Sequence, residues 1–219
     1  MTVTIKAKSL EDFVADIFSA AGCSKEEGGR IGRYLVSANL SGHDSHGVVR
    51  VPRYASQKKA GTVVADVTVD VLVDTPVIAV VDGKYGFGQT VTPQAVRIGI
   101  EKAKKNGLSA VTLRNAGHIG RVGDWAEMAA AEGLVSVHFA NAAGSVLVAP
   151  YGGTDRRFST APYCVGVPRP GQEPLILDFA TSIVAEGKVL VASQGGKKIP
   201  ADALIGLDGQ PGGDPHLLY

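Results

Sequence analysis

The sequence contains little cysteine and no excess of charge of either sign. Cys23 and Cys164 are the two cysteines among 219 residues, and neither belongs to a C-x-x-C motif. This spacing argues against a disulfide scaffold and against a zinc site made of thiolates, and it predicts two buried thiols. The 22 Lys plus Arg and 21 Asp plus Glu leave a formal net charge of +1. That balance favours neither nucleic acid nor an anionic membrane surface as a partner.

Long hydrophobic runs are also absent. No apolar stretch approaches the roughly 20 residues that cross a bilayer, and the first residues lack the continuous apolar region of a secretory signal. We therefore expect a soluble, cytoplasmic protein. Its 45% hydrophobic and 20% charged residues are typical of a globular protein and argue against intrinsic disorder. The 28 glycines indicate many tight turns, or backbone that a ligand approaches closely.

Hydrophobic periodicity predicts an α/β protein that begins with helices. Ser9 and Ser24 are helix-start signals, the second in capping-box form with Glu27, and Gly42 ends the second helix. Further helices are expected over residues 52–61, 94–106, 124–132 and 181–192. Strands are expected over residues 67–73 (half-buried), 77–81, 108–113, 134–139, 163–167 and 175–177, with turns at 83–88 and 208–209.

Residues 44–53 bring together side chains that suit a small carboxylic acid. His46 follows Ser45, and Arg50 lies four positions further on. Imidazole exchanges a proton near neutral pH, a hydroxyl orients a substrate oxygen, and a guanidinium holds a carboxylate with two parallel hydrogen bonds. This set fits an acid that carries an oxygen at its second carbon. A polar surface loop with a capping serine and solvated arginines explains the same residues, so both interpretations stay open here.

His118 lies in a second candidate loop, residues 117–123, between a predicted strand and a predicted helix. Its glycines would let a ligand approach the backbone, and the carboxyl ends of strands are common ligand sites in α/β proteins. The spacing is G-x-x-G-x-x-G rather than G-x-G-x-x-G, and no carboxylate follows about 20 residues later, so a standard Rossmann site is not expected. A glycine-rich turn with a merely polar histidine is the alternative.

Other chemistries have less support. His43 and His46 lie three positions apart, but no H-E-x-x-H motif supplies further ligands, so we expect no metal site. A metal-dependent lyase using these two residues and His118 is the weakest alternative. His138 lies in an apolar strand and suits a core or rim position. The G-x-S-x-G and Walker A motifs are absent. Asp178 ends a predicted strand, where it either fixes a ribose hydroxyl or caps the next helix.

The segment 41–54, SGHDSHGVVRVPRY, is accompanied by further short motifs in a characteristic order. They are residues 82–83, 86–89, 117–120, 149–153, 178–182, 187–189, 199–200 and 208–209. Together they resemble the malate/L-lactate dehydrogenase type 2 family, also called the sulfolactate dehydrogenase-like family. The resemblance extends over nearly the whole chain, from about Leu10 to Pro215.

The resemblance implies an oxidoreductase that uses NAD or NADP. The implied reaction moves a hydride between nicotinamide and the second carbon of a small 2-hydroxy or 2-oxo acid, or of a cyclic imino acid in some members. The implied fold has a helical substrate and dimerisation segment over residues 1–75. A mixed, largely antiparallel sheet with a non-Rossmann NAD(P)-binding domain is expected over residues 76–219. A homodimer with its active site near the subunit interface is also implied.

Residue roles follow from the same resemblance. His46 is similar to the substrate-side acid/base of the family, with Ser45 and Arg50 holding the substrate. His118 is similar to the histidine beside the nicotinamide, and which of the two histidines is the principal base stays open. The expected cofactor contacts are His118, Thr160, Asp178, Phe179 and Ala180.

Two departures from the family pattern affect these expectations. Members usually have Thr-Asn-Pro where this chain has Thr160-Ala161-Pro162, which removes one side-chain hydrogen bond near the cofactor. Members also continue beyond the last residues of this chain into a Lys-Gly-Tyr-Gly motif. We therefore expect a domain that is incomplete at its carboxyl end. A truncated, inactive relative that dimerises or binds ligand without turnover is the alternative function.

Overall fold

A computed structural model of the chain describes residues 4–142, 144–195 and 198–218. The helices and helical turns are α1 (Ala7–Ala20), α2 (Lys25–Leu40), η1 (Asp44–His46), η2 (Val48–Arg50), α3 (Val51–Lys59), α4 (Gly88–Asn106), α5 (Gly123–Ala130), α6 (Glu186–Ser193) and η3 (Pro215–Leu217). The strands are β1 (Asp70–Asp74), β2 (Ile78–Gly86), β3 (Ala110–Ala116), β4 (Ser136–Phe139), β5 (Tyr163–Val167), β6 (Leu175–Phe179), β7 (Leu204–Ile205) and β8 (Pro211–Gly212). This confirms the predicted mixture of helices and strands.

The helical hairpin of α1 and α2 depends on glycines that admit close backbone approach. A β-carbon at Gly28 would lie 2.7 Å from Ala15 O, and one at Gly32 would lie 2.6 Å from Glu11 O. Because the two glycines are four positions apart, they share one face of α2, and α1 packs directly against that face. The predicted start at Ser9 is wrong by two residues, since α1 begins at Ala7.

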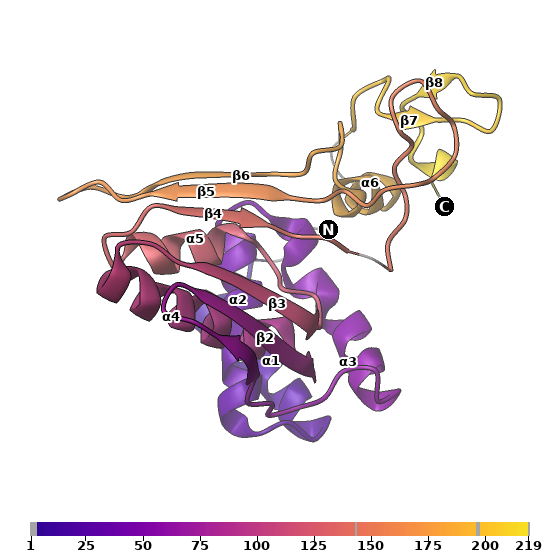
Figure 1. Cartoon of the computed structure of the whole chain (residues 1–219). Coiled ribbons are helices and arrows are strands. Elements are labelled where there is room, and N and C mark those ends of the chain that lie inside the picture. The colour runs from indigo at the N-terminus through magenta and orange to yellow at the C-terminus, as the bar shows by residue number, and fades with distance from the viewer. Residues whose placement is uncertain (1–3, 143, 196–197, 219) are drawn as a thin grey trace.

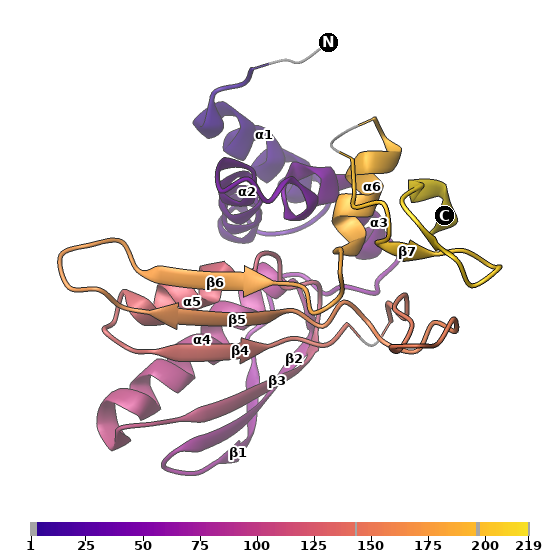
Figure 2. The same cartoon turned by 90° about the horizontal axis from the view of Figure 1, so that it is seen from above.

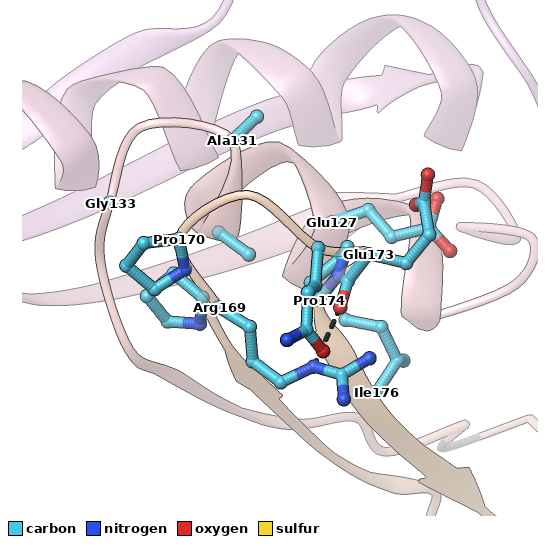
Figure 3. A pocket seen from close by; sticks show the side chains of 11 residues that line it. Glu127, Ala131, Gly133, Arg169, Pro170, Glu173, Pro174 and Ile176 are labelled. Atoms are coloured by element: carbon cyan, nitrogen blue, oxygen red, sulfur yellow. Dashed lines mark hydrogen bonds between the residues drawn. The ribbon is translucent and has the colours of Figure 1, made fainter.

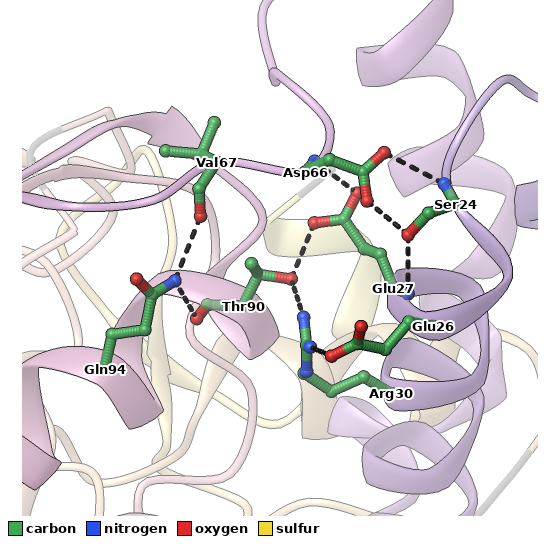
Figure 4. Close-up of polar contacts among 8 residues, drawn as sticks. All are labelled: Ser24, Glu26, Glu27, Arg30, Asp66, Val67, Thr90 and Gln94. Carbon is green, nitrogen blue, oxygen red and sulfur yellow. Dashed lines mark hydrogen bonds and ion pairs between the residues drawn. The ribbon is translucent and has the colours of Figure 1, made fainter.

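The buried carboxylate of Glu27 connects three segments that are distant in the sequence. Ser24 caps α2 as predicted, accepting from the Glu27 N–H at 3.1 Å. The second half of the predicted capping box is wrong, because the Glu27 side chain accepts instead from Asp66 N–H (2.7 Å) and the Thr90 hydroxyl (2.6 Å). Asp66 takes over the missing role and accepts from Ser24 N–H at 2.9 Å. Figure 4 shows this network joining α2, the segment before β1, and α4.

The strands form separate small sheets rather than the single sheet expected. β1 pairs antiparallel with β2 and β2 pairs parallel with β3, whereas β4, β5 and β6 are antiparallel throughout. β7 and β8 form a hairpin around the predicted turn at residues 208–209. The predicted half-buried strand at residues 67–73 is wrong in extent and burial. β1 covers Asp70–Asp74, all of it is exposed, and a bulge between Val71 and Val73 breaks the expected alternation.

Three further boundaries differ because tertiary contacts override local signals. α4 begins at Gly88 rather than at residue 94, with Pro93 inside it, because buried Phe87 anchors its first turn against Phe18 at 5.6 Å between ring centroids. β2 consequently continues to Gly86, through part of the predicted turn. α6 begins at Glu186 rather than at residue 181, since backbone and side-chain bonds to the 160–161 segment hold Thr181 in an irregular stretch.

Helices α4 and α5 contact each other and cover the sheets. α4 packs on β2 and β3, and α5 packs on β4, β5 and β6 (Figure 2). Gly166 in β5 allows this contact, because its β-carbon would lie 2.9 Å from Ala126 of α5. The core beside α5 contains Trp125 and Cys164. Cys23 and Cys164 are both free and buried, as predicted.

The face of the β4–β5–β6 sheet that points away from α5 is apolar and uncovered by any described element (Figure 1). Its exposed side chains on β4 and β6 are 44% to 80% accessible, and they are Val137, Phe139, Leu175, Leu177 and Phe179. We call this set the open sheet face. In the part of the chain that the structure describes, no helix is long and apolar enough to cross a membrane.

We predict that Glu27→Ala lowers the free energy of unfolding by about 1–3 kcal/mol, because Asp66 N–H and the Thr90 hydroxyl would lose a buried acceptor. Urea denaturation measures this. The matched control is Glu26→Ala, which removes an exposed i,i+4 ion pair with Arg30 and should cost about 0.5 kcal/mol or less. Equal losses of unfolding free energy in the two variants would show that the buried network stabilises the fold no more than the exposed ion pair does.

Candidate active site

Two short helical turns place His46 beside Ser45 and Arg50. Ser45 Oγ lies 3.0 Å from His46 Nδ1, and the Arg50 Nε–H donates to the Ser45 carbonyl at 2.6 Å. Asn39 of α2 holds this turn from behind, because its amide donates to Asp44 Oδ1 and its Oδ1 accepts from Val48 N–H. Ser45 and Arg50 are each about 7% exposed, so they are not part of a solvated loop.

The loop after β3 brings His118 onto the same spot. The rings of His46 and His118 are nearly parallel, 21° apart, with centroids separated by 5.4 Å. His118 Nδ1 lies 2.6 Å from the hydroxyl of Tyr54 and accepts from Gly120 N–H at 3.3 Å. The structure thus brings together the four residues named as catalytic candidates from sequence, and it adds Tyr54 behind them.

Burial and a neighbouring guanidinium keep both imidazoles uncharged. Burial, followed by the positive charge of Arg50, lowers the pKa of His46 to about 4. The same two causes, in the same order, lower the pKa of His118 well below its ordinary value. Near neutral pH the site therefore presents two neutral imidazoles beside a fixed cation. Such a site can accept a proton and can hold a small anion.

Helix α6 closes one side of the site through a glycine. A β-carbon at Gly187 would collide with Ser45 Cβ and would lie 3.2 Å from Arg50 Nη2. The helix therefore rests directly on the Ser45 turn. The charge of the next residue, Lys188, contributes to the lowered pKa of His46, after burial and the charges of Arg50, His43 and Arg121.

The glycines of the 117–123 loop serve the packing of the chain. Gly117 N–H donates to Gly86 O at 2.8 Å, Gly120 N–H to His118 Nδ1, and Gly123 N–H to Asp178 Oδ2 at 2.7 Å. Gly88 has no room for a β-carbon, which would collide with the His118 carbonyl. These three loop amides are already bonded within the protein, so they do not form a ready cradle for phosphates.

The expected cofactor residues form one neighbouring region. Thr181 N–H donates to Thr160 O at 3.0 Å, which places Thr160 beside the stretch that follows β6. The ring of Phe179 is on the open sheet face and meets Tyr163 edge-on at 5.7 Å. Ala180 is half-buried. Asp178 accepts from Gly123 N–H at the start of α5, which precedes it in the chain. The predicted cap of the next helix is wrong, because α6 begins at Glu186 with no side-chain cap.

Asp178 also connects this region electrostatically with the histidines. Burial lowers the pKa of His43, while the nearby Asp178 carboxylate acts in the opposite direction. The His43 ring lies 6.3 Å from that of His46. His138 is half-buried, with Nε2 at 2.9 Å from Ser136 Oγ, in agreement with the rim position expected. Among the described residues, no group of three His, Cys, Asp or Glu side chains could hold a metal ion.

Sequence reasoning noted Tyr54 only as the end of a motif and missed its contact with His118. A signal was present, because Arg50 and Tyr54 are four positions apart and therefore share a helix face. Gln89, whose Nε2–H donates to Tyr54 Oη at 3.2 Å, lies in the part of α4 that the periodicity did not predict.

Two surface hollows lie away from this site. One of about 560 Å³ lies beside the end of α5 and the β5–β6 connection, where Arg169 Nε donates to Glu173 O at 2.7 Å (Figure 3). The other, of about 710 Å³, lies over the network around Ser24 and Arg30. No histidine lines either hollow. Neither is therefore a better candidate for proton-transfer chemistry than the histidine pair.

Comparison with known proteins gives the family. The sequence matches the malate/L-lactate dehydrogenase family model over residues 5–219. Hydroxycarboxylate dehydrogenase B of Escherichia coli (strain K12) is 39% identical over 212 residues, which are 97% of this chain and 59% of that protein. The (2R)-3-sulfolactate dehydrogenase (NADP(+)) of Chromohalobacter salexigens is 34% identical over 215 residues, 98% of this chain and 64% of that protein.

A solved structure agrees with these relatives. The delta1-piperideine-2-carboxylate reductase of Pseudomonas syringae superposes with a TM-score of 0.89 and 31% identity, covering 99% of this chain and 65% of that one. The chain spans about three fifths of the length of the curated relatives it matches, 59% and 64% for the two named above. The chain belongs to the malate/L-lactate dehydrogenase family.

Proposed function

We propose that this chain carries the catalytic histidines of an NAD- or NADP-dependent dehydrogenase of small 2-hydroxy acids. The observation that carries the proposal is the stacked pair of neutral imidazoles, His46 and His118, beside the buried guanidinium of Arg50. The names of the relatives support the substrate class, and the NADP(+) in one of those names supports a nicotinamide cofactor.

The residues present fit the nicotinamide end of such a cofactor. A neutral imidazole at His118, the Thr160 hydroxyl and the backbone of Phe179 and Ala180 offer the neutral polar groups that a carboxamide and a ribose require. The three bonded glycine amides offer no phosphate cradle, in keeping with a non-Rossmann mode of binding. The cofactor would exchange a hydride with the substrate, and the residues of this chain would position the acid and move its proton.

The substrate acid is held by charge and oriented by hydrogen bonds. Arg50 would bind the carboxylate, and its bond to the Ser45 carbonyl keeps the guanidinium in a fixed plane. Ser45 and His46 would face the oxygen on the second carbon. In the oxidative direction, neutral His46 accepts the hydroxyl proton. Holding these groups in one geometry lowers the entropic part of the barrier.

A cyclic imino acid is a second candidate substrate. The solved reductase with a TM-score of 0.89 acts, by its name, on a piperideine carboxylate. Such a molecule carries the same carboxylate next to a C=N bond, so the proposed Arg50 clamp would serve both. An assay of 2-oxo acids and cyclic imino acids, each with NADH and NADPH, separates the two.

We also propose that the chain works as a cytoplasmic homodimer. The open sheet face supports the assembly into a dimer, because contiguous exposed Val, Leu and Phe side chains are typical of surfaces that another protein chain covers. The proposed division has a helical segment at residues 1–75 and a nucleotide-binding domain at residues 76–219. Sedimentation equilibrium tests the assembly, and a monomer at micromolar concentration would contradict it.

We predict that His46→Ala and His118→Ala each lower turnover by at least about 100-fold, because each removes a group from the reacting atoms. The matched control is His138→Ala, which removes a half-buried histidine outside the pair and should leave turnover within about twofold. Spectrophotometric oxidation of NADH or NADPH by 2-oxo acids measures the rates, and circular dichroism confirms folding. Turnover like that of the unmodified protein in both variants would contradict the assignment.

The binding of cofactor by the chain itself separates this proposal from the non-catalytic alternative. We predict that NADH or NADPH added to the purified chain shows saturable binding by fluorescence titration. The absence of binding by both nucleotides would favour a relative that dimerises without turnover.

The low pKa of His46 gives a pH prediction. A base with a pKa of about 4 stays neutral as pH falls through the ordinary imidazole range. We therefore expect kcat/KM for hydroxy-acid oxidation to stay level down to about one pH unit above that value. An acid limb near pH 6.5 would contradict this. Between the ordinary imidazole pKa and the lowered pKa of His46, the unfolded chain binds a proton that the folded chain does not. The free energy of unfolding therefore decreases as the pH is lowered through this range, and the folded fraction must be measured at each pH.

A further inference from the structure

We propose that Tyr54 is a positioning residue that holds His118 in the tautomer with its proton on Nε2. This inference rests on the proposed function. In the proposed reaction, His118 presents an N–H donor, not a lone pair, to the oxygen of the substrate. Tyr54 acts through the contact of its hydroxyl with His118 Nδ1. This assigns different roles to the two imidazoles of the pair.

The tautomer follows from the partners of His118 Nδ1. A backbone N–H can only donate, and Gly120 N–H is directed at Nδ1 at 3.3 Å. The Tyr54 hydroxyl lies 2.6 Å from the same atom. A ring nitrogen that accepts from a backbone amide carries no proton of its own. Because a neutral imidazole has one ring proton, that proton is on Nε2.

The hydroxyl of Tyr54 has one proton to give, and its surroundings decide where it goes. Gln89 Nε2–H donates to Tyr54 Oη at 3.2 Å. The other acceptor near the hydroxyl, the His118 carbonyl, is more distant at 3.4 Å. Turning the Gln89 amide would bring a second acceptor against Tyr54 and leave two acceptors competing for one proton. The order Gln89 to Tyr54 to His118 Nδ1 gives each of these two hydrogen bonds one donor and one acceptor, and Gln89 Oε1 is the one atom of the three side chains that is buried without a partner among the described residues.

Burial keeps these groups in the protonation states that the chain of bonds requires. Tyr54 is 2% exposed, and burial raises its pKa to about 12, so the hydroxyl keeps its proton. Burial and the charge of Arg50 lower the pKa of His118, so the ring stays singly protonated. The hydrogen bonds of His118 among the described residues use Nδ1 and the carbonyl, which leaves the Nε2–H for a ligand.

The consequence is a division of labour in the proposed reaction. Nε2–H of His118 donates a hydrogen bond to the oxygen on the second carbon, which polarises a carbonyl and needs no transfer of that proton. In oxidation the hydroxyl O–H bond breaks, and its proton goes to the lone pair of His46. This role requires the His46 proton on Nδ1, which lies 3.0 Å from Ser45 Oγ, so that the lone pair is on Nε2.

Nuclear magnetic resonance tests the tautomer directly. In protein labelled with ¹⁵N-histidine and free of ligand, two-bond ¹H–¹⁵N correlations report which ring nitrogen is protonated. We expect His118 to show a protonated Nε2 and an unprotonated Nδ1 near neutral pH. A protonated Nδ1 in the unmodified protein would overturn the proposal, and this measurement needs no variant.

The substitution Tyr54→Phe tests the role of the hydroxyl. We expect the His118 signals to move toward an average of both tautomers, with the signals of His138 unchanged as the internal control. An unaltered His118 spectrum in a folded variant would show that Gly120 alone sets the tautomer and would overturn the role of Tyr54.

Kinetics distinguish this inference from the proposed function. In protein that turns over, Tyr54→Phe should lower kcat about tenfold, the effect of one lost hydrogen bond, and change KM for the acid less than twofold. An unchanged kcat overturns the positioning role while leaving the proposed function intact. If the unmodified protein shows no turnover, the proposed function fails and the tautomer measurement still decides the inference.

Discussion

The candidate site depends on two places where backbones meet without room for a β-carbon. At Gly88 the start of α4 lies against the carbonyl of His118, and at Gly187 the start of α6 lies against Ser45. These contacts fix the loop that carries His118 against the start of α4, and they fix the turn that carries Ser45 against the start of α6. Any other residue at either position would push a catalytic candidate away, and a displacement of about 1 Å is enough to cost orders of magnitude in rate.

Desolvation determines what the assembled side chains can do. The rings of His46 and His118 lie against each other, and burial together with the positive charge of Arg50 lowers the pKa of both imidazoles. Neutral bases beside a fixed cation suit an anionic acid whose hydroxyl proton must leave. The same low polarity strengthens the hydrogen bonds of Tyr54 with His118. These features support the dehydrogenase reaction proposed above.

The boundaries of α2 were predicted correctly from signals confined to a few neighbouring residues. Ser24 caps the start of α2, and Gly42 follows its end in the left-handed region, because a cap depends on its own turn. The start of α4 and the partners of Glu27 could not be predicted, since contacts with distant segments determine them. The resemblance named His46 and His118 as candidates, but their contact and the part of Tyr54 depend on tertiary packing that no local pattern encodes.

A crystal structure of the chain with NADH or NADPH and oxamate, an unreactive analogue of a 2-oxo acid, tests the central claim most directly. We expect the oxamate carboxylate on Arg50, with its carbonyl oxygen within hydrogen-bond distance of Nε2 of His118 and of the His46 ring. Oxamate bound elsewhere, or His46 and His118 facing different surfaces, would contradict the proposed site.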